Sequence, residues 1–296
     1  MERVLVTGAS GPIGAVLLPY LESQGGRVVR LVRGPAKGTD QVRWDPMQPL
    51  APSVVSGCDV VVHLAGESVF GRWTREKKKA ILESRVHGTS NLARAMAQSE
   101  VRPRVFICAS AVGFYGNRGD EILTEECASG QDFPSEICRA WESASRIAAD
   151  AGIRTLNLRI GLVLSPKGGA LGMMLPAFNL GLGGRLGSGK QWSSWIHVDD
   201  IVAAVHHLIQ TESLSGPVNF VAPNPVTNAD FTKSLASVLR RPAFLPVPRF
   251  AARLAFGQMA DQLLFSGQRV LPAKLQASGY AFRYPELRAA LDDLLG

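Results

Sequence analysis

The feature that most constrains this chain is a glycine-rich turn at residues 8–14. The apolar run Val4–Thr7 leads directly into this turn, and a segment with helical apolar spacing follows it. Such glycines let the backbone turn sharply and approach a pyrophosphate, while the N-terminus of the next helix favours negative charge. Strand, glycines and helix together predict a dinucleotide-binding turn. The residues expected to hold the cofactor here are Gly8, Ser10, Gly11, Ile13 and Gly14.

Short apolar runs alternate with longer segments of helical spacing along most of the chain. Helices are expected near residues 80–97, 135–149 and 201–210. Continuous apolar strands separated by helices are typical of a parallel sheet that is buried on both faces. The sequence therefore predicts an α/β fold with a doubly wound, Rossmann-type parallel sheet. The expected strands are Val4–Thr7, Val28–Val32, Asp59–Ala65, Val105–Ser110, Thr155–Ile160 and Val218–Ala222.

Arg33, at the end of the second expected strand, bears on the choice of cofactor. Sites selective for NAD usually carry an acidic residue about 20 positions beyond the glycines, where it binds the ribose hydroxyls. This neighbourhood holds Val32 and Arg33 and no acidic residue. A guanidinium matches a 2′-phosphate, so the sequence favours NADP. The alternative is that Arg30 and Arg33 are ordinary exposed charges at a strand end.

Composition restricts the class of protein. No run of about 18 apolar residues occurs, and no signal peptide is recognisable, so we expect a cytoplasmic protein without a membrane partner. The four cysteines show no paired spacing, which argues against a disulfide framework or a metal site. The formal charge of +7 comes from scattered basic residues without interleaved aromatics. This pattern favours a solvated face over a nucleic-acid surface.

Further candidate cofactor residues follow the later strands. The third strand ends in His63, Leu64 and Ala65, whose small neighbours let the chain pass close to a cofactor, although His63 is equally explained as a packed side chain. The helix after it carries Lys79 and Arg85, and solvent exposure would account for Lys79 as well. Beyond the strand at residues 155–160, the backbone around Leu162 is expected to meet the nicotinamide amide.

Several longer motifs resemble those of the extended short-chain dehydrogenase/reductases. They are Thr7–Gly14, Leu64–Gly66, Ser110–Gly116 and Trp195–Asp200. Within that superfamily the chain is similar to the branch known as epimerase family proteins. The resemblance covers nearly the whole chain and implies an NADP-binding Rossmann domain over residues 1–165, to which residues 191–222 return. Residues 166–190 and 223–296 would then form a smaller, mostly helical substrate-side region.

The catalytic pattern of the family is incomplete. Redox-active members use a serine together with a tyrosine and a lysine four residues apart on one helix face. The expected helix at 135–149 contains neither tyrosine nor lysine, and Cys138 and Glu142 stand at the corresponding spacing. Ser110 is retained and Tyr115 follows it, so these two are the candidate catalytic residues. Tyr115 is equally explained as an aromatic wall of a ligand pocket.

Three functions remain open at this stage, and the weakest of them is association with RNA through the basic residues. The first is an NADP-dependent oxidoreductase or epimerase-like enzyme acting on a small carbonyl or hydroxyl substrate, as a monomer or homodimer. The second is a non-catalytic NADP(H)-binding sensor or interaction protein, which the missing tyrosine and lysine favour. Gly184–Lys190 resembles a phosphate-binding loop, but Gln191 replaces the serine or threonine that would hold magnesium, which argues against a nucleotide triphosphatase.

Overall fold

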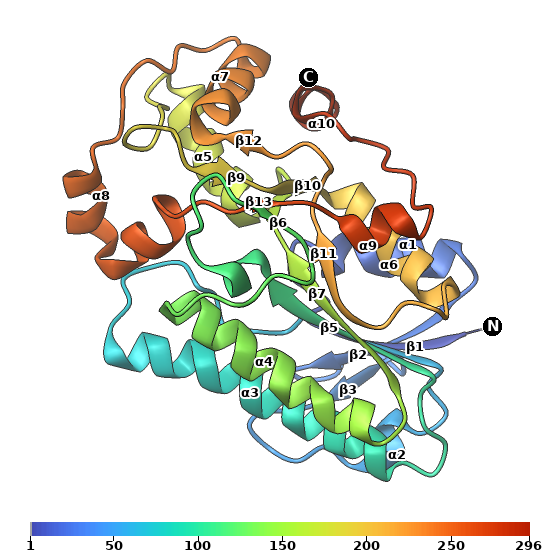
Figure 1. Ribbon diagram of the computed structural model, residues 1–296. Helices are drawn as coiled ribbons and strands as arrows, with labels where there is room; N and C mark the ends of the chain where they lie inside the picture. The colour runs from blue at the N-terminus through green and yellow to red at the C-terminus, as the bar shows by residue number, and fades with distance from the viewer. Residues whose placement is uncertain (1) are drawn as a thin grey trace.

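A seven-stranded parallel sheet forms the centre of the protein, whose computed structural model describes residues 2–296 (Figure 1). Its strand order is β11-β7-β5-β4-β1-β2-β3, and every neighbouring pair is parallel. The strands are β1 (Arg3–Thr7), β2 (Arg27–Val32), β3 (Gln41–Arg43), β4 (Val60–His63), β5 (Val105–Ala111), β7 (Arg154–Ile160) and β11 (Gly216–Phe220).

The strand order reverses direction between β1 and β4. From β1 the chain builds outward to β2 and β3 on one side, and then returns to lay β4, β5, β7 and β11 on the other. Connections that leave two neighbouring strands in opposite directions open a crevice beyond the carboxyl ends of those strands. The glycine-rich turn follows β1 and residues 64–66 follow β4, so both segments border this crevice.

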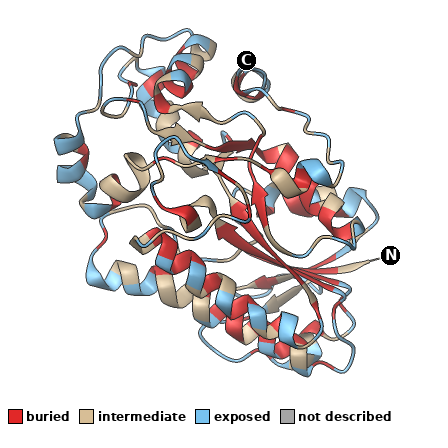
Figure 2. Ribbon diagram, in the orientation of Figure 1, coloured by how far each residue is buried: buried red, intermediate tan, exposed pale blue. Residues whose placement is uncertain are grey.

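Helices cover both faces of the sheet (Figure 1). Along β1, Leu5 points to one face and Val4 and Val6 point to the other, as the two-residue period of a strand requires. The first face packs against helices α2 (Pro52–Val55), α3 (Arg75–Gln98) and α4 (Phe133–Asp150). The second packs against α1 (Gly14–Ser23), α6 (Val198–Gln210) and α9 (Ala273–Ala277). Figure 2 shows the central strands of the sheet, such as β4 and β5, buried along nearly their whole length, whereas β3 at the edge is not.

A third hydrophobic core lies beyond the carboxyl edge of the sheet. Trp195 and Phe231 are buried in it, between two short strands and three helices. These elements are β8 (Leu162–Leu164), β10 (Trp195–His197), α5 (Gly169–Asn179), α7 (Asn228–Leu239) and α10 (Leu287–Leu295). The remaining elements are η1 (Val112–Tyr115), β6 (Ile122–Leu123), β9 (Trp192–Ser193), β12 (Val226–Thr227), α8 (Arg249–Phe256), η2 (Ala260–Leu264) and β13 (Arg269–Val270).

The predicted fold class is confirmed, and so are the six expected strands, with ends shifted by up to two residues. The seventh strand, β3, was not expected, because three residues at a sheet edge carry no alternation that could identify them. The division into a cofactor domain and a substrate-side region stays a prediction. No helix among residues 2–296 is both long and apolar enough to cross a membrane.

Candidate functional site

The glycine-rich turn is packed so tightly that side chains are excluded from it. Gly8 has a φ of 72°, and a Cβ atom there would lie 2.7 Å from the carbonyl carbon of Leu64. The N–H of Gly11 donates to the carbonyl of Gly8 at 3.0 Å and closes the turn. A Cβ atom on Gly14 would lie 2.4 Å from that same carbonyl oxygen. Since Cβ atoms almost never approach others this closely, the turn requires glycine at both positions.

A cavity of about 710 Å³ lies beyond the carboxyl ends of β1 and β2. It brings together six of the expected cofactor residues, which come from three separate segments. Arg33 is exposed at the end of β2, where its guanidinium is free to meet a ligand in this cavity. The six residues are Gly8, Ser10, Gly11, Arg33, Leu64 and Ala65.

A second cavity, of about 570 Å³, lies on the other side of the turn, lined by Pro12 and Ile13. Its walls come from the β5–η1 junction, β8, α4, α5 and the η2 region. Apolar and aromatic side chains dominate these walls, and within residues 2–296 the lining includes no Asp, Glu, His, Lys or Tyr. Such a cavity suits an apolar ligand. Of the expected cofactor residues, Ile13, Arg85 and Leu162 line it.

Cys138 is the thiol that lines this second cavity. It lies on α4, and its sulfur is 3.6 Å from the carbonyl oxygen of Ala111. Burial, reinforced by the Glu142 charge, raises the pKa of the Cys138 thiol to about 11. The group is therefore protonated near neutral pH and does not act as a thiolate nucleophile.

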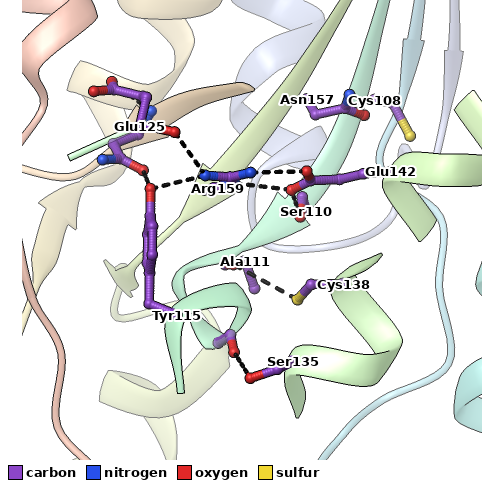
Figure 3. Close-up of polar contacts among 12 residues, drawn as sticks. Cys108, Ser110, Ala111, Tyr115, Glu125, Ser135, Cys138, Glu142, Asn157 and Arg159 are labelled. Carbon is purple, nitrogen blue, oxygen red and sulfur yellow. Dashed lines mark hydrogen bonds and ion pairs between the residues drawn. The ribbon is translucent and has the colours of Figure 1, made fainter. Parts of the chain in front are cut away.

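Ser110 and Glu142 belong to a buried polar network behind this cavity (Figure 3). The Ser110 hydroxyl donates to Glu142 Oε1 at 2.8 Å. Arg159, from the neighbouring strand β7, donates to both carboxylate oxygens of Glu142, at 2.9 and 3.0 Å. Its Nη1 also donates to the Tyr115 hydroxyl at 3.0 Å, and that hydroxyl donates to Asn219 Oδ1 at 2.6 Å. The bidentate geometry makes Arg159 the centre of the network.

The network fixes the orientation of the two candidate catalytic residues, whose catalytic role stays a prediction. Neither Ser110 nor Tyr115 lines either cavity. Tyr115 is fully buried, and burial raises the pKa of its hydroxyl to about 12, despite the nearby Arg159. The Tyr115 hydroxyl accepts from Arg159 because a buried guanidinium needs acceptors, and the Ser110 hydroxyl donates to the carboxylate of Glu142. The sequence analysis did not single out Arg159, and its signal is an arginine near the end of a strand that is buried along most of its length.

The remaining expected cofactor residues lie outside both cavities. Lys79 is an exposed side chain on α3, 3.8 Å from Glu83. Gly14 lies beneath the turn, against Ala9. His63 is fully buried, and its Nδ1 lies 2.6 Å from the Thr7 hydroxyl. The Thr7 hydroxyl oxygen also accepts from the N–H of Ala65 at 3.2 Å, so Thr7 links His63 to the segment that follows β4.

We expect His63 to make stability depend on pH. Burial, together with the Arg85 charge, lowers the pKa of His63 to about 4, so the unfolded chain binds a proton that the folded protein rejects. Above about pH 6.5 both states hold a neutral His63 and the protein keeps its full stability. As the pH falls toward 4, protonation of the unfolded chain lowers the free energy of unfolding by about 3 kcal/mol. Urea unfolding of wild type and His63→Gln across this range measures it. If the free energy of unfolding of His63→Gln changed with pH as it does in wild type, His63 would not be the group responsible.

Two family models match the chain. One, described as the NAD dependent epimerase/dehydratase family, matches residues 4–221, and the other, a domain of unknown function (DUF1731), matches residues 247–294. An epimerase family protein of Mycobacterium tuberculosis is 39% identical over 290 residues, which are 97% of this chain and 96% of the relative.

Solved structures agree with this assignment. The crystal structure of human epimerase family protein SDR39U1 (isoform 2) with NADPH has a TM-score of 0.92 and 35% identity, and the match covers 99% of both chains. A nucleoside-diphosphate sugar epimerase from Corynebacterium glutamicum has a TM-score of 0.84 and 41% identity, over the whole of this chain and 58% of that one. The expected resemblance is therefore confirmed.

Proposed function

Because this chain belongs to the NAD-dependent epimerase/dehydratase family, among its epimerase family proteins, we propose that it binds NADP(H) and oxidises or reduces a small, largely apolar hydroxyl or carbonyl compound. The observation that carries the proposal is the pair of cavities on either side of the glycine-rich turn. One is polar enough for the phosphates of a nucleotide. The other is apolar and large enough for a substrate beside a nicotinamide.

The residues of the first cavity fit a dinucleotide. Gly8 and Gly14 carry no side chains, so the backbone of the turn can approach a pyrophosphate at the N-terminus of α1. Arg33 would bind the 2′-phosphate at the end of β2. The human relative named above was crystallised with NADPH, which supports the same cofactor here. When bound, the cofactor supplies or accepts a hydride.

The second cavity would hold the substrate away from water. Apolar walls strengthen polar interactions with the few groups that face the ligand. Among these walls, Cys138 carries an exchangeable proton near neutral pH without a permanent charge, and so do the hydroxyls of Ser193, Ser194 and Ser266. A proton for the substrate oxygen would therefore come from this thiol, from one of these hydroxyls or from solvent, since Tyr115 is enclosed elsewhere.

The second candidate function is a non-catalytic NADP(H) sensor. It is favoured by one observation: among residues 2–296, no Asp, Glu, His, Lys or Tyr lines the second cavity. The two functions separate in an assay of reduced nicotinamide absorbance over a panel of apolar carbonyl compounds. Oxidation of NADPH that weakens in Cys138→Ser supports the enzyme, and tight NADPH binding without oxidation of cofactor supports the sensor.

Cofactor choice is tested at Arg33. We expect Arg33→Ala to weaken NADPH binding by about 10- to 100-fold and to leave NADH binding unchanged, because only NADPH carries the 2′-phosphate. Fluorescence titration of the reduced nicotinamide measures both. Arg27→Ala is the matched control, since Arg27 is exposed at the opposite end of the same strand. Equal affinities for NADPH and NADH in wild type would overturn the proposal.

A further inference from the structure

Arg85 on α3 is a buried cation in the wall of the apolar cavity. Only 9% of the residue is exposed. Its Nη1 donates to the carbonyl oxygens of Glu67 and Ile81 at 2.9 and 3.1 Å, and its guanidinium lies 4.7 Å from the ring of Trp141. These contacts hold the side chain in one position. They leave its charge without an anionic partner.

No carboxylate within residues 2–296 forms an ion pair with Arg85. The nearest candidate, Glu67, is bound by Lys77 at 2.7 Å. Burial lowers the pKa of Arg85, so its environment disfavours the positive charge. An uncompensated buried charge is costly, and proteins seldom keep one unless it has a counter-ion or a ligand.

The free edge of the guanidinium defines what the ligand must offer. No acceptor among residues 2–296 takes a hydrogen bond from Nε or Nη2 of Arg85. These two donors lie side by side on one edge, the arrangement that matches both oxygens of a carboxylate. Gly66 lets the backbone pass beside the group, since a Cβ there would lie only 3.2 Å from Cζ of Arg85.

We propose that Arg85 binds a carboxylate on the substrate, so that the substrate class is a carboxylic acid with an apolar body. Nearby Val69, Phe70 and Ile137 line the same cavity and would contact the apolar part. The phosphates of a dinucleotide would be bound by the glycine-rich turn and Arg33 in the other cavity. The claim that this acid is also the substrate that reacts rests on the proposed function. The claim that the acid binds at Arg85 does not.

Paired probes test the carboxylate requirement directly. Calorimetric titration compares octanoate with octan-1-ol, which share an apolar chain and differ in charge. We expect wild type to bind octanoate at least 10-fold more tightly. Arg85→Gln should weaken octanoate binding by about 10- to 100-fold and abolish the preference over octanol. Arg94→Gln is the matched control, because Arg94 lies exposed on the same helix, and it should behave as wild type.

Each outcome decides one part of the inference. Equal binding of octanoate and octanol to wild type, or octanoate binding that Arg85→Gln leaves unchanged, would overturn it. Loss of NADPH affinity in Arg85→Gln with octanoate binding intact would assign the guanidinium to the cofactor instead. Arg85→Lys retains the charge without the paired donors and should give an intermediate affinity. Octanoate binding by a wild type that fails to bind NADPH would leave this site standing and remove the proposed function.

Discussion

Replacing Gly14 by alanine is expected to abolish measurable NADPH binding and to lower the free energy of unfolding by about 3 kcal/mol. The added Cβ would lie 2.4 Å from the Gly8 carbonyl oxygen and 2.7 Å from the Ala9 Cα. Both are backbone atoms, so no side-chain rotation can relieve the overlap. The turn itself must move, and with it the site proposed for the pyrophosphate. Nicotinamide fluorescence and urea unfolding measure the two effects.

Gly34→Ala is the matched control for this experiment. Gly34 lines the same cavity, yet a Cβ there would meet no atom within 4 Å, and its φ lies outside the left-handed region. We expect this variant to unfold as wild type does, within about 0.5 kcal/mol. If Gly14→Ala bound NADPH as tightly as Gly34→Ala, the tight turn would not be what holds the cofactor.

The sheet and the segments that line the first cavity were predictable because their signals are local. Each apolar strand is a continuous run, and the turn at residues 8–14 places its glycines within one short segment. Arg33 was found by counting from that turn to the end of the next strand. Such features depend on neighbouring residues, and tertiary contacts do not override them.

The second cavity, proposed above for the substrate, was not predictable in the same way. It is assembled from segments between Pro12 and Gln268 that meet only in the folded protein. Ser110 and Tyr115 match a family motif, but the Tyr115 side chain is held by Arg159 and Asn219, which lie far along the chain. The Ser110 hydroxyl is held by Glu142 on α4. Glu142 was placed on the right helix, although its partner on β7 could not be read from spacing.

Glu142→Leu is expected to lower the free energy of unfolding by about 3–5 kcal/mol. The Arg159 side chain is only 4% exposed, and Glu142 accepts two of its hydrogen bonds. Removing the carboxylate leaves a buried guanidinium with no counter-ion, and the Ser110 hydroxyl loses its acceptor. Equilibrium unfolding in urea measures the change. Glu83→Leu is the control, since its weak surface pair with Lys79 should contribute less than about 1 kcal/mol.

The double variant Glu142→Leu, Arg159→Met separates a structural role from a catalytic one. It removes both buried charges, so part of the lost stability should return, because desolvating an ion pair offsets much of its attraction. If the network only supports the fold, NADPH affinity follows stability and recovers as well. A double variant no more stable than Glu142→Leu would show that the unpaired guanidinium is not the cause of the lost stability. A stable Glu142→Leu protein that has lost turnover alone would show that Glu142 serves the reaction and that the network is more than a scaffold.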